Sequence, residues 1–186
     1  SKLEGKALTE ARQRFGMVFQ GAALFDSMTV FENVAFPLVE SRAGRGLKPD
    51  EVRRRVVEKL AVVDLGEEVL ERWPAQLSGG MRKRAAIARA LALDPELLYL
   101  DEPGSGLDPV NAARLDELVL NLRHDLGTTV VMVTHEVASV FAVADRMLYL
   151  DDRQRTMTAL DDPHVLLASG PAEVREFLAR GHAVAA

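Results

Sequence analysis

The sequence predicts an α/β protein in which helices flank a mostly parallel sheet. Short, uniformly apolar runs at residues 97–100 and 128–133 are typical of strands that are buried on both faces. They alternate with helical segments at residues 111–126 and 136–144, as in a sheet built from strand–helix–strand units. The stretch at residues 29–93 carries only helical signals, so we expect an all-helical subdomain inserted between two strands of the sheet.

Local signals set the expected limits of the elements. Pro49 suits the first turn of a helix, Gly127 suits a helix C-cap, and Pro95 stops the helix before it. The expected helices span residues 29–38, 49–63, 80–93, 111–126, 136–144 and 171–180, after a polar lead-in of helical propensity at 1–13. The expected strands span residues 15–20, 97–100, 128–133, 147–150 and 155–159.

The composition fits one compact domain and argues against several functional classes. The chain has 186 residues, of which 48% are hydrophobic, and a chain of this length usually forms a single core. Its net charge of −5 gives no footprint for nucleic acid, so we expect no nucleic-acid partner. The absence of cysteine excludes disulfides and thiolate metal sites. No apolar run reaches the roughly 20 residues that span a bilayer, so a membrane role would require a partner.

A glycine turn precedes the helix expected at residues 80–93. Ser78, Gly79 and Gly80 follow Leu77, and the helix behind them carries a run of basic residues. Backbone N–H groups at a helix start bind phosphate with the help of the helix dipole, and glycine lets the backbone approach closely. The alternative interpretation is that Ser78 is only an N-cap and the glycines form only a turn.

Two carboxylates follow the apolar strand at residues 97–100. Asp101 and Glu102 come directly after it, at the strand end where open α/β sheets bind ligands. Asp101 fits the role of holding Mg²⁺, and Glu102 could polarise the water that attacks a γ-phosphate. An acidic loop after a strand is common, but the sequence Gly-Leu-Asp-Pro at 106–109 favours the functional interpretation.

Polar residues also end two other expected strands. His135 follows the strand at 128–133, and Gln20 closes the strand at 15–20. We expect both at the carboxyl edge of the sheet, where the uncharged amide of Gln20 could contact Mg²⁺ and the attacking water. The remaining histidines are expected to be structural, and these are His124, His164 and His182.

Taken in order, these segments resemble the motifs of ABC transporter ATPases. Over residues 14–159 the Q-loop, signature, Walker B, D-loop and H-loop are matched by Gln20, 77–81, 101–102, 105–108 and His135. The resemblance implies an ABC-type P-loop NTPase core that binds ATP with Mg²⁺. It assigns catalysis to Glu102, His135 and Gln20. It assigns Mg²⁺ binding to Asp101 and Gln20, and nucleotide binding to Ser78, Gly79, Gly80 and Asp108.

A finer resemblance connects the chain with the ATPases of Mla-type systems. It is carried by residues 14–25 and 28–38, by Met81 and by residues 173–178. Mla-type systems move phospholipids, working with a permease and a lipid-binding MCE-domain protein, and related sterol or aromatic-compound MCE systems would share these motifs. The resemblance implies a permease partner, a second ATPase subunit arranged head to tail, and an indirect MCE-type partner. It also implies a peripheral location at the cytoplasmic face of the inner membrane.

The segment 21–38 is expected to contact the permease. It follows Gln20 directly, and it carries more apolar side chains than one short helix can bury on its own domain. The alternative is that all of them pack into the helical subdomain. They are Leu24, Phe25, Met28, Val30, Phe31, Val34 and Phe36.

The 186 residues contain no match to the P-loop pattern G-x-x-x-x-G-K-[ST]. In the family that the chain resembles, this motif lies upstream of the Q-loop. We therefore expect a partial ATPase domain at 1–186 whose N-terminal P-loop portion is absent and which is inactive alone. Its expected parts are the Q-loop strand and loop at 14–26, the helical subdomain at 27–94, the core at 95–160 and a helical tail at 161–186.

Two other functions stay open at the level of sequence. One is a soluble ABC ATPase that acts on nucleic acid or ribosomes, which the acidic composition disfavours. The other is a non-catalytic interaction module, which the missing P-loop alone would support. A smaller departure from the family is the sequence Asp-Asp-Arg-Gln at 151–154, where a glycine turn is usual, and it puts the local hairpin in doubt.

Overall fold

The chain forms two compact units, one ending at Val133 and one beginning at Thr134. The computed structural model describes residues 4–41 and 44–182. Residues 1–3 and 183–186 of the expected domain, and residues 42–43 of its helical part, lie outside the described residues.

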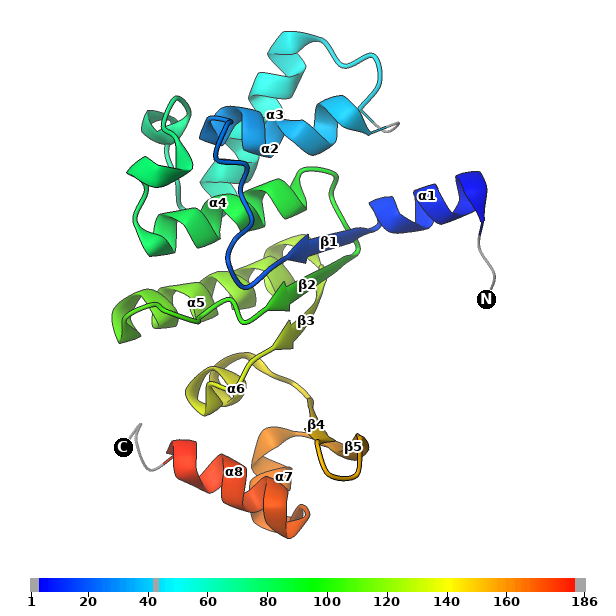
Figure 1. Ribbon diagram of the computed structural model, residues 1–186, viewed down its shortest axis with the longest axis vertical. Coiled ribbons are helices and arrows are strands. Elements are labelled where there is room, and N and C mark those ends of the chain that lie inside the picture. Colours follow the sequence, from blue (N-terminus) through cyan, green and yellow to red (C-terminus); the bar gives the residue numbers. More distant parts are fainter. Residues whose placement is uncertain (1–3, 42–43, 183–186) are drawn as a thin grey trace. The chain divides into compact units, whose positions relative to one another are not determined.

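A three-stranded parallel sheet forms the centre of the first unit (Figure 1). Its strands are β1 (Phe15–Val18), β2 (Leu97–Asp101) and β3 (Thr129–Val133), in the order β1-β2-β3. Phe15 aligns with Leu97, and Leu97 aligns with Thr129, so the carboxyl ends of the strands lie at one edge. β1 ends at Val18, so the expectation that Gln20 closes this strand is wrong: Gln20 lies in the turn that follows.

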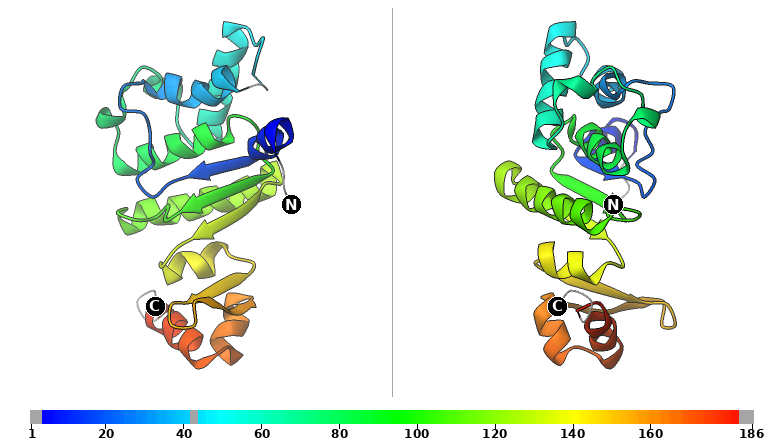
Figure 2. Two further views of the ribbon diagram at one scale, coloured as in Figure 1. Left: turned by 45° about the vertical axis from the view of Figure 1, so that its right-hand side comes forward. Right: turned by 90° about the vertical axis from the view of Figure 1, so that its left-hand side faces the viewer.

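One face of this sheet carries the core of the unit. Val18, Leu98 and Leu100 are buried on it, and α4 (Gly79–Leu91) and α5 (Pro109–Leu126) pack against β1 and β3. Because the strand order never reverses and parallel crossovers are right-handed, both connections are placed on the same face (Figure 2). On the other face the large side chains of β1 and β3 are substantially exposed, and these are Phe15, Met17, Val131 and Val133. The expectation of a sheet covered on both faces therefore fails for the part of the first unit that the structure describes.

The expected helical stretch is present between β1 and β2. It consists of α2 (Val30–Glu40), α3 (Pro49–Val62), the 3₁₀ turns η1 (Glu67–Val69) and η2 (Pro74–Gln76), and α4. α2, α3 and α4 contact one another through a buried apolar core that includes Val34, Leu60 and Ile87. Helix α1 (Gly5–Gln13) precedes β1, as the polar lead-in predicted.

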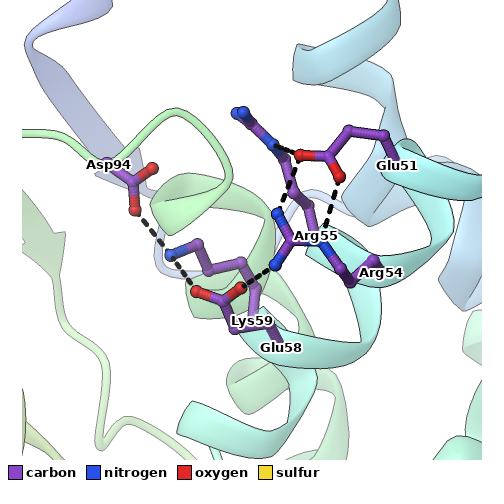
Figure 3. A network of polar contacts seen from close by, with 6 residues as sticks. All are labelled: Glu51, Arg54, Arg55, Glu58, Lys59 and Asp94. Carbon is purple, nitrogen blue, oxygen red and sulfur yellow. Dashed lines mark hydrogen bonds and ion pairs between the residues drawn. The ribbon is translucent and has the colours of Figure 1, made fainter. Parts of the chain in front are cut away.

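A polar network fixes α3 against the turn between α4 and β2 (Figure 3). Glu51 accepts hydrogen bonds from Arg54 and Arg55 within α3. The side-chain hydrogen bond with Arg54 is the main cause that lowers the pKa of Glu51 to about 2, and the hydrogen bond with Arg55 lowers it further. The buried Nζ of Lys59 lies 2.5 Å from Oδ1 of Asp94, in the turn that ends the helix before Pro95.

The second unit packs three helices around a two-stranded hairpin. Its elements are α6 (Val137–Val143), β4 (Met147–Asp151), β5 (Thr156–Asp161), α7 (Pro163–Ser169) and α8 (Ala172–His182). Val140, Met147, Val174 and Leu178 lie in its buried core, which α6, β4 and α8 share. The sequence did not predict α7, and α8 continues two residues beyond the expected end at residue 180.

The hairpin forms without the glycine turn that is usual in related sequences. Oδ1 of Asp151 accepts hydrogen bonds from the N–H groups of Arg153 and Gln154 at 2.8 and 2.7 Å. Arg155 takes the left-handed backbone conformation that glycine would otherwise supply, with φ of 51°. A carboxylate that satisfies the turn's N–H groups thus replaces the expected glycine. In the described residues of both units, no helix has the length and apolar character that crossing a membrane requires.

Candidate functional site

Residues at the carboxyl edge of the parallel sheet form the centre of the candidate site. Asp101 is the last residue of β2 and aligns with Val133 at the end of β3. Glu102 follows directly, and Gln20 lies in the turn after β1, the neighbouring strand. The structure therefore brings Gln20, Asp101 and Glu102 to one edge of one sheet, where polar side chains can converge on a ligand.

Glu102 has an uncommon backbone conformation that its neighbours hold. Its φ of 46° is left-handed, which costs a residue with a Cβ about 1 kcal/mol or more. Its N–H donates to the carbonyl of Val133 at 2.9 Å, and its own carbonyl accepts from the N–H of Ser105 at 3.2 Å. The Oε2 atom of its carboxylate is buried. Such maintained strain is frequent at functional sites, where it fixes the direction of a side chain.

Two cations of α4 hold the turn that carries Gln20. Nζ of Lys83 donates to the carbonyl of Gln20 at 2.9 Å and to the carbonyl of Glu102 at 3.1 Å. Arg89 donates to the carbonyls of Ala22 and Ala23 at 3.2 and 2.8 Å, and burial lowers its pKa from the ordinary value. Ala22 and Ala23 both have positive φ, so these bonds hold a turn of costly geometry.

The sequence analysis did not single out these two cations. It treated the basic residues of α4 as a general feature of the helix, whereas Lys83 is only 8% exposed. The available signal was helical periodicity, because Lys83 lies in register with the buried Ile87 and Leu91. A charged residue on the apolar stripe of a helix needs polar partners, so its position predicts a buried polar contact.

α4 begins at Gly79, one residue before the expected start, and Ser78 is its N-cap. Oγ of Ser78 accepts a hydrogen bond from the N–H of Met81 at 3.2 Å, so the N-cap interpretation describes its contacts within the chain. An added Cβ on Gly80 would lie 3.3 Å from Oδ1 of Asn111, so the glycine allows close packing against α5. The N–H groups of a first helical turn lack intrahelical partners, and this leaves the phosphate interpretation compatible with the cap.

Asp108 caps α5, a contact that the sequence analysis missed. Oδ1 accepts from the N–H groups of Val110 and Asn111 at 3.1 and 3.0 Å. The hydrogen bond from the Asn111 side chain is the main cause that lowers the pKa of Asp108 below its ordinary value. The available signal was the pair Asp108–Pro109, because proline favours the first position after an N-cap.

His135 belongs to the second unit, in the segment between β3 and α6. It lines a cavity of about 740 Å³ together with residues of the hairpin and of α8, among them Tyr149, Asp151 and Phe177. The rings of Tyr149 and Phe177 lie 5.7 Å apart between centroids. The ring of His164 contacts the ring of Phe141, and His124 is exposed in the last turn of α5, so the expectation that both are structural stays a prediction. The side chain of His182 lies outside the described residues.

The donor types at the sheet edge fit Mg²⁺. Asp101 offers a carboxylate and Gln20 an amide oxygen, and Mg²⁺ usually takes one or two such protein ligands together with phosphate oxygens and water. The described residues contain no cluster of three or more histidine, aspartate or glutamate side chains suited to a metal. One carboxylate and one amide oxygen fit an ion that is shared with a phosphate ligand.

Comparison with known proteins identifies the family. The family model described as ABC transporter matches residues 1–105, more than half of the chain. The chain belongs to the ABC transporter ATP-binding family. ATP hydrolysis is the activity of that family, and its members bind ATP, typically with Mg²⁺.

Solved ABC structures confirm the predicted fold class. The dimeric ATP-binding cassette MJ0796, bound to ADP and Pi, has a TM-score of 0.75 and 34% identity, covering 87% of this chain and 68% of that one. The cbiO1 protein from Clostridium perfringens, part of the ABC transporter complex cbiONQ, has a TM-score of 0.79 and 28% identity, covering 100% and 72%.

Curated ABC relatives carry several transport names. Mkl of Mycobacterium tuberculosis, described as a probable ribonucleotide transport ATP-binding protein, is 43% identical over 93% of this chain and 46% of its own length. The methionine import ATP-binding protein MetN of Carboxydothermus hydrogenoformans is 40% identical over 82% of this chain and 44% of its own length. The chain spans less than half the length of these relatives. The finer Mla-type resemblance and the roles of the individual site residues stay predictions.

Proposed function

We propose that the protein is the ATP-binding and ATP-hydrolysing subunit of an ABC transporter. The observation that carries the proposal is the placement of Asp101 and Glu102 after β2 beside Gln20 after β1, in a chain of the ABC family. The site gives no comparable support to the two alternatives, which are a soluble ABC ATPase that acts on nucleic acid or ribosomes and a non-catalytic interaction module.

Each site residue has a defined role in this proposal. Glu102 orients and polarises the attacking water, because its strained backbone fixes the direction of its carboxylate. Asp101 and Gln20 hold Mg²⁺, which neutralises charge that develops on the transferred phosphoryl group. His135 has a catalytic role, as its resemblance to the H-loop residue implies. Ser78, Gly79, Gly80 and Asp108 bind nucleotide held by a second copy of the protein, arranged head to tail.

Replacement of the proposed base tests the catalytic part of the proposal. We expect Glu102→Gln in the complete gene product to lower turnover about 10²-fold or more, because the amide keeps the shape but cannot polarise water. ATP affinity should stay within about twofold of the parent. Phosphate release and nucleotide binding measure the two quantities, with Glu117→Gln on the exposed face of α5 as the matched control.

Two outcomes decide this test. Near-normal turnover of Glu102→Gln assigns the base to another residue, and no turnover by the parent protein with its membrane partner refutes the enzymatic proposal. The 186 residues alone lack a P-loop pattern and should show no turnover above background. Mg²⁺-dependent turnover by these residues alone would contradict that expectation.

We further propose that the transporter moves lipid, with this ATPase bound to a permease at the cytoplasmic face of the inner membrane and an MCE-type protein as an indirect partner. The support is the resemblance of residues 14–25, 28–38 and 173–178 to Mla-type ATPases. The names of the relatives Mkl and MetN instead mention ribonucleotide and methionine.

A reconstituted complex separates these cargoes. We expect the ATPase rate of the protein with its permease to change with the phospholipid composition of the vesicle, and to be unaffected by added ribonucleotide or methionine. Transfer of a labelled phospholipid out of the vesicle, dependent on ATP, provides the direct measurement. Stimulation by either small molecule, without lipid transfer, would contradict the lipid proposal.

A further inference from the structure

Lys83 is a buried cation on the helix that begins at the signature segment. Its side chain is 8% exposed, although it lies on a helix whose other charged residues reach the surface or its margin. A buried ammonium group requires polar partners, because burial removes its hydration. The position of those partners therefore shows what this lysine holds.

Two of its partners are main-chain oxygens on loops that are far apart in the sequence. Nζ donates to the carbonyl of Gln20 at 2.9 Å and to the carbonyl of Glu102 at 3.1 Å. An ammonium group has three donors, and hydrogen bonds from a charged donor are stronger than neutral ones. One side chain thus joins the turn after β1 to the loop after β2.

Further hydrogen bonds extend this connection through the main chain. The N–H of Glu102 donates to the carbonyl of Val133, which ties the same residue to the end of β3. Arg89, six residues after Lys83 on α4, binds the turn at Ala22 and Ala23. The backbones beside Gln20 and Glu102 are consequently fixed to α4, the helix that starts at Gly79.

We propose that Lys83 is a positioning residue for hydrolysis, which sets the Gln20 and Glu102 backbones relative to each other and to the signature helix. The inference rests on the proposed ATPase function and assigns Lys83 no contact with nucleotide. A displacement of about 1 Å in a catalytic group can cost about 10²-fold in rate, so loss of this connection affects turnover more than binding.

Two substitutions of Lys83 and one control substitution of Arg84, all on α4, test the proposal. Lys83→Met removes the charge and the donors but keeps an unbranched apolar stem, and Lys83→Arg keeps both charge and donors. Arg84→Met is the control, because Arg84 also binds two main-chain carbonyls, those of Val63 and Asp64, in a part of the helical subdomain away from Gln20 and Glu102. All variants are made in the complete gene product with its permease.

We expect Lys83→Met to lower kcat about tenfold or more and to raise the Mg²⁺ concentration needed for half-maximal rate. Its ATP Kd should stay within about twofold of the parent, and Lys83→Arg should recover part of the lost rate. Arg84→Met should lower the unfolding temperature at least as much as Lys83→Met while leaving kcat within about twofold. Equal kcat in Lys83→Met and the parent, or equal losses of kcat in Lys83→Met and Arg84→Met, would overturn the proposal.

Amide hydrogen exchange gives a readout that does not depend on turnover. Exchange in segments 19–23 and 102–106 should accelerate in Lys83→Met and not in Arg84→Met, and unchanged exchange in Lys83→Met overturns the connection itself. A parent protein without ATPase activity refutes the proposed function, while the exchange comparison still judges the connection. If Lys83→Met does not fold, Lys83→Gln, which retains two neutral donors, carries the same comparisons.

Discussion

Two carboxylates lie within ion-pair distance of the buried ammonium group of Lys59, and the nearer one is on an exposed turn. Nζ lies 2.5 Å from Oδ1 of Asp94, whose side chain is 69% exposed, and 3.5 Å from Oε1 of Glu58 (Figure 3). The pair joins α3 of the helical subdomain to the turn that leads into β2. Removing one partner of a buried pair is costly because the other charge stays behind without compensation.

We expect Asp94→Asn to lower the free energy of unfolding by about 1 kcal/mol, less than for a fully buried pair because Glu58 stays in reach. Asparagine tolerates the left-handed backbone of this position, where φ is 50°, so the change isolates the charge. Lys59→Met should cost less, since it removes the buried charge together with its need for a partner. Urea unfolding measures both, and an effect of Lys59→Met that exceeds that of Asp94→Asn would contradict this account.

The location of a single residue was predictable where it lies at or directly after the end of a strand. Asp101 and Glu102 follow an apolar run, and a parallel strand delivers such residues to one edge of the sheet. The partners of Lys83 were not predictable, because they depend on how the loops at Gln20 and Glu102 pack against α4. The same holds for the strained φ of Glu102, which results from contacts with β3.

At the scale of elements, a capping box defines the start of α2. Oγ1 of Thr29 accepts from the N–H of Glu32 at 3.2 Å, and the carboxylate of Glu32 accepts from the N–H of Thr29 at 2.7 Å. The N–H groups of Val30 and Phe31 donate to the carbonyls of residues 72 and 70. The cap therefore fixes the helix that follows the 21–29 turn.

We expect Thr29→Ala to lower the free energy of unfolding by about 1 kcal/mol, because the N–H of Glu32 loses its partner at the helix start. Glu32→Gln is the control, since glutamine can still accept the reciprocal hydrogen bond. It should cost only the favourable charge at the helix N-terminus, about 0.3–1 kcal/mol. Chemical denaturation compares the two, and equal stability of Thr29→Ala and the parent would show that tertiary contacts alone determine this end.

Elements with strong end signals were predicted within a few residues, and weaker ones were missed. α5 ends at Leu126 because Gly127 takes a left-handed conformation with φ of 62°. α7 has only seven residues, too few for helical periodicity to show, although Asp162 and Pro163 form a cap signal like that of α5. The hairpin at β4 and β5 forms because Asp151 satisfies the turn, a contact that the sequence pattern did not reveal.

At the scale of the whole molecule, the order of the strands explains the one-sided sheet. The sequence favoured burial on both faces because residues 97–100 of β2 and 130–133 of β3 do not alternate between apolar and polar side chains. Because both crossovers are right-handed and run in the same direction along the sheet, α4 and α5 lie on one face only. The helices between β1, β2 and β3 therefore cannot cover the second face. An apolar strand thus predicts that both of its faces are buried, but it does not show which segment covers each face.

The 21–38 segment combines a fixed backbone with an exposed aromatic ring. Asn33, which is fully buried, accepts from the N–H of Phe25 at 2.8 Å and donates to its carbonyl at 3.1 Å. The ring of Phe25 lies 4.9 Å from the ring of Phe36 between centroids, in a tilted arrangement, and the guanidinium carbon of Arg89 lies 5.5 Å from its centroid, yet the residue is 41% exposed. Val30 and Val34 are buried within the unit, so only part of the apolar set is available to a partner. This division supports the prediction that the segment contacts the permease.

We expect Phe25→Asp to reduce recovery of the protein with its permease about tenfold or more, because it places a charge in an apolar contact. ATP affinity and the unfolding temperature of the isolated gene product should change little, since the Asn33 hydrogen bonds to the main chain are retained. Val165→Asp, which changes a 47% exposed valine in the first turn of α7, is the matched control and should assemble normally. Co-purification from membranes and ATP-dependent transport measure the effect. Normal assembly and transport by Phe25→Asp would place the docking surface on another part of the protein, because a charge at the centre of an apolar contact cannot be accommodated without loss of binding.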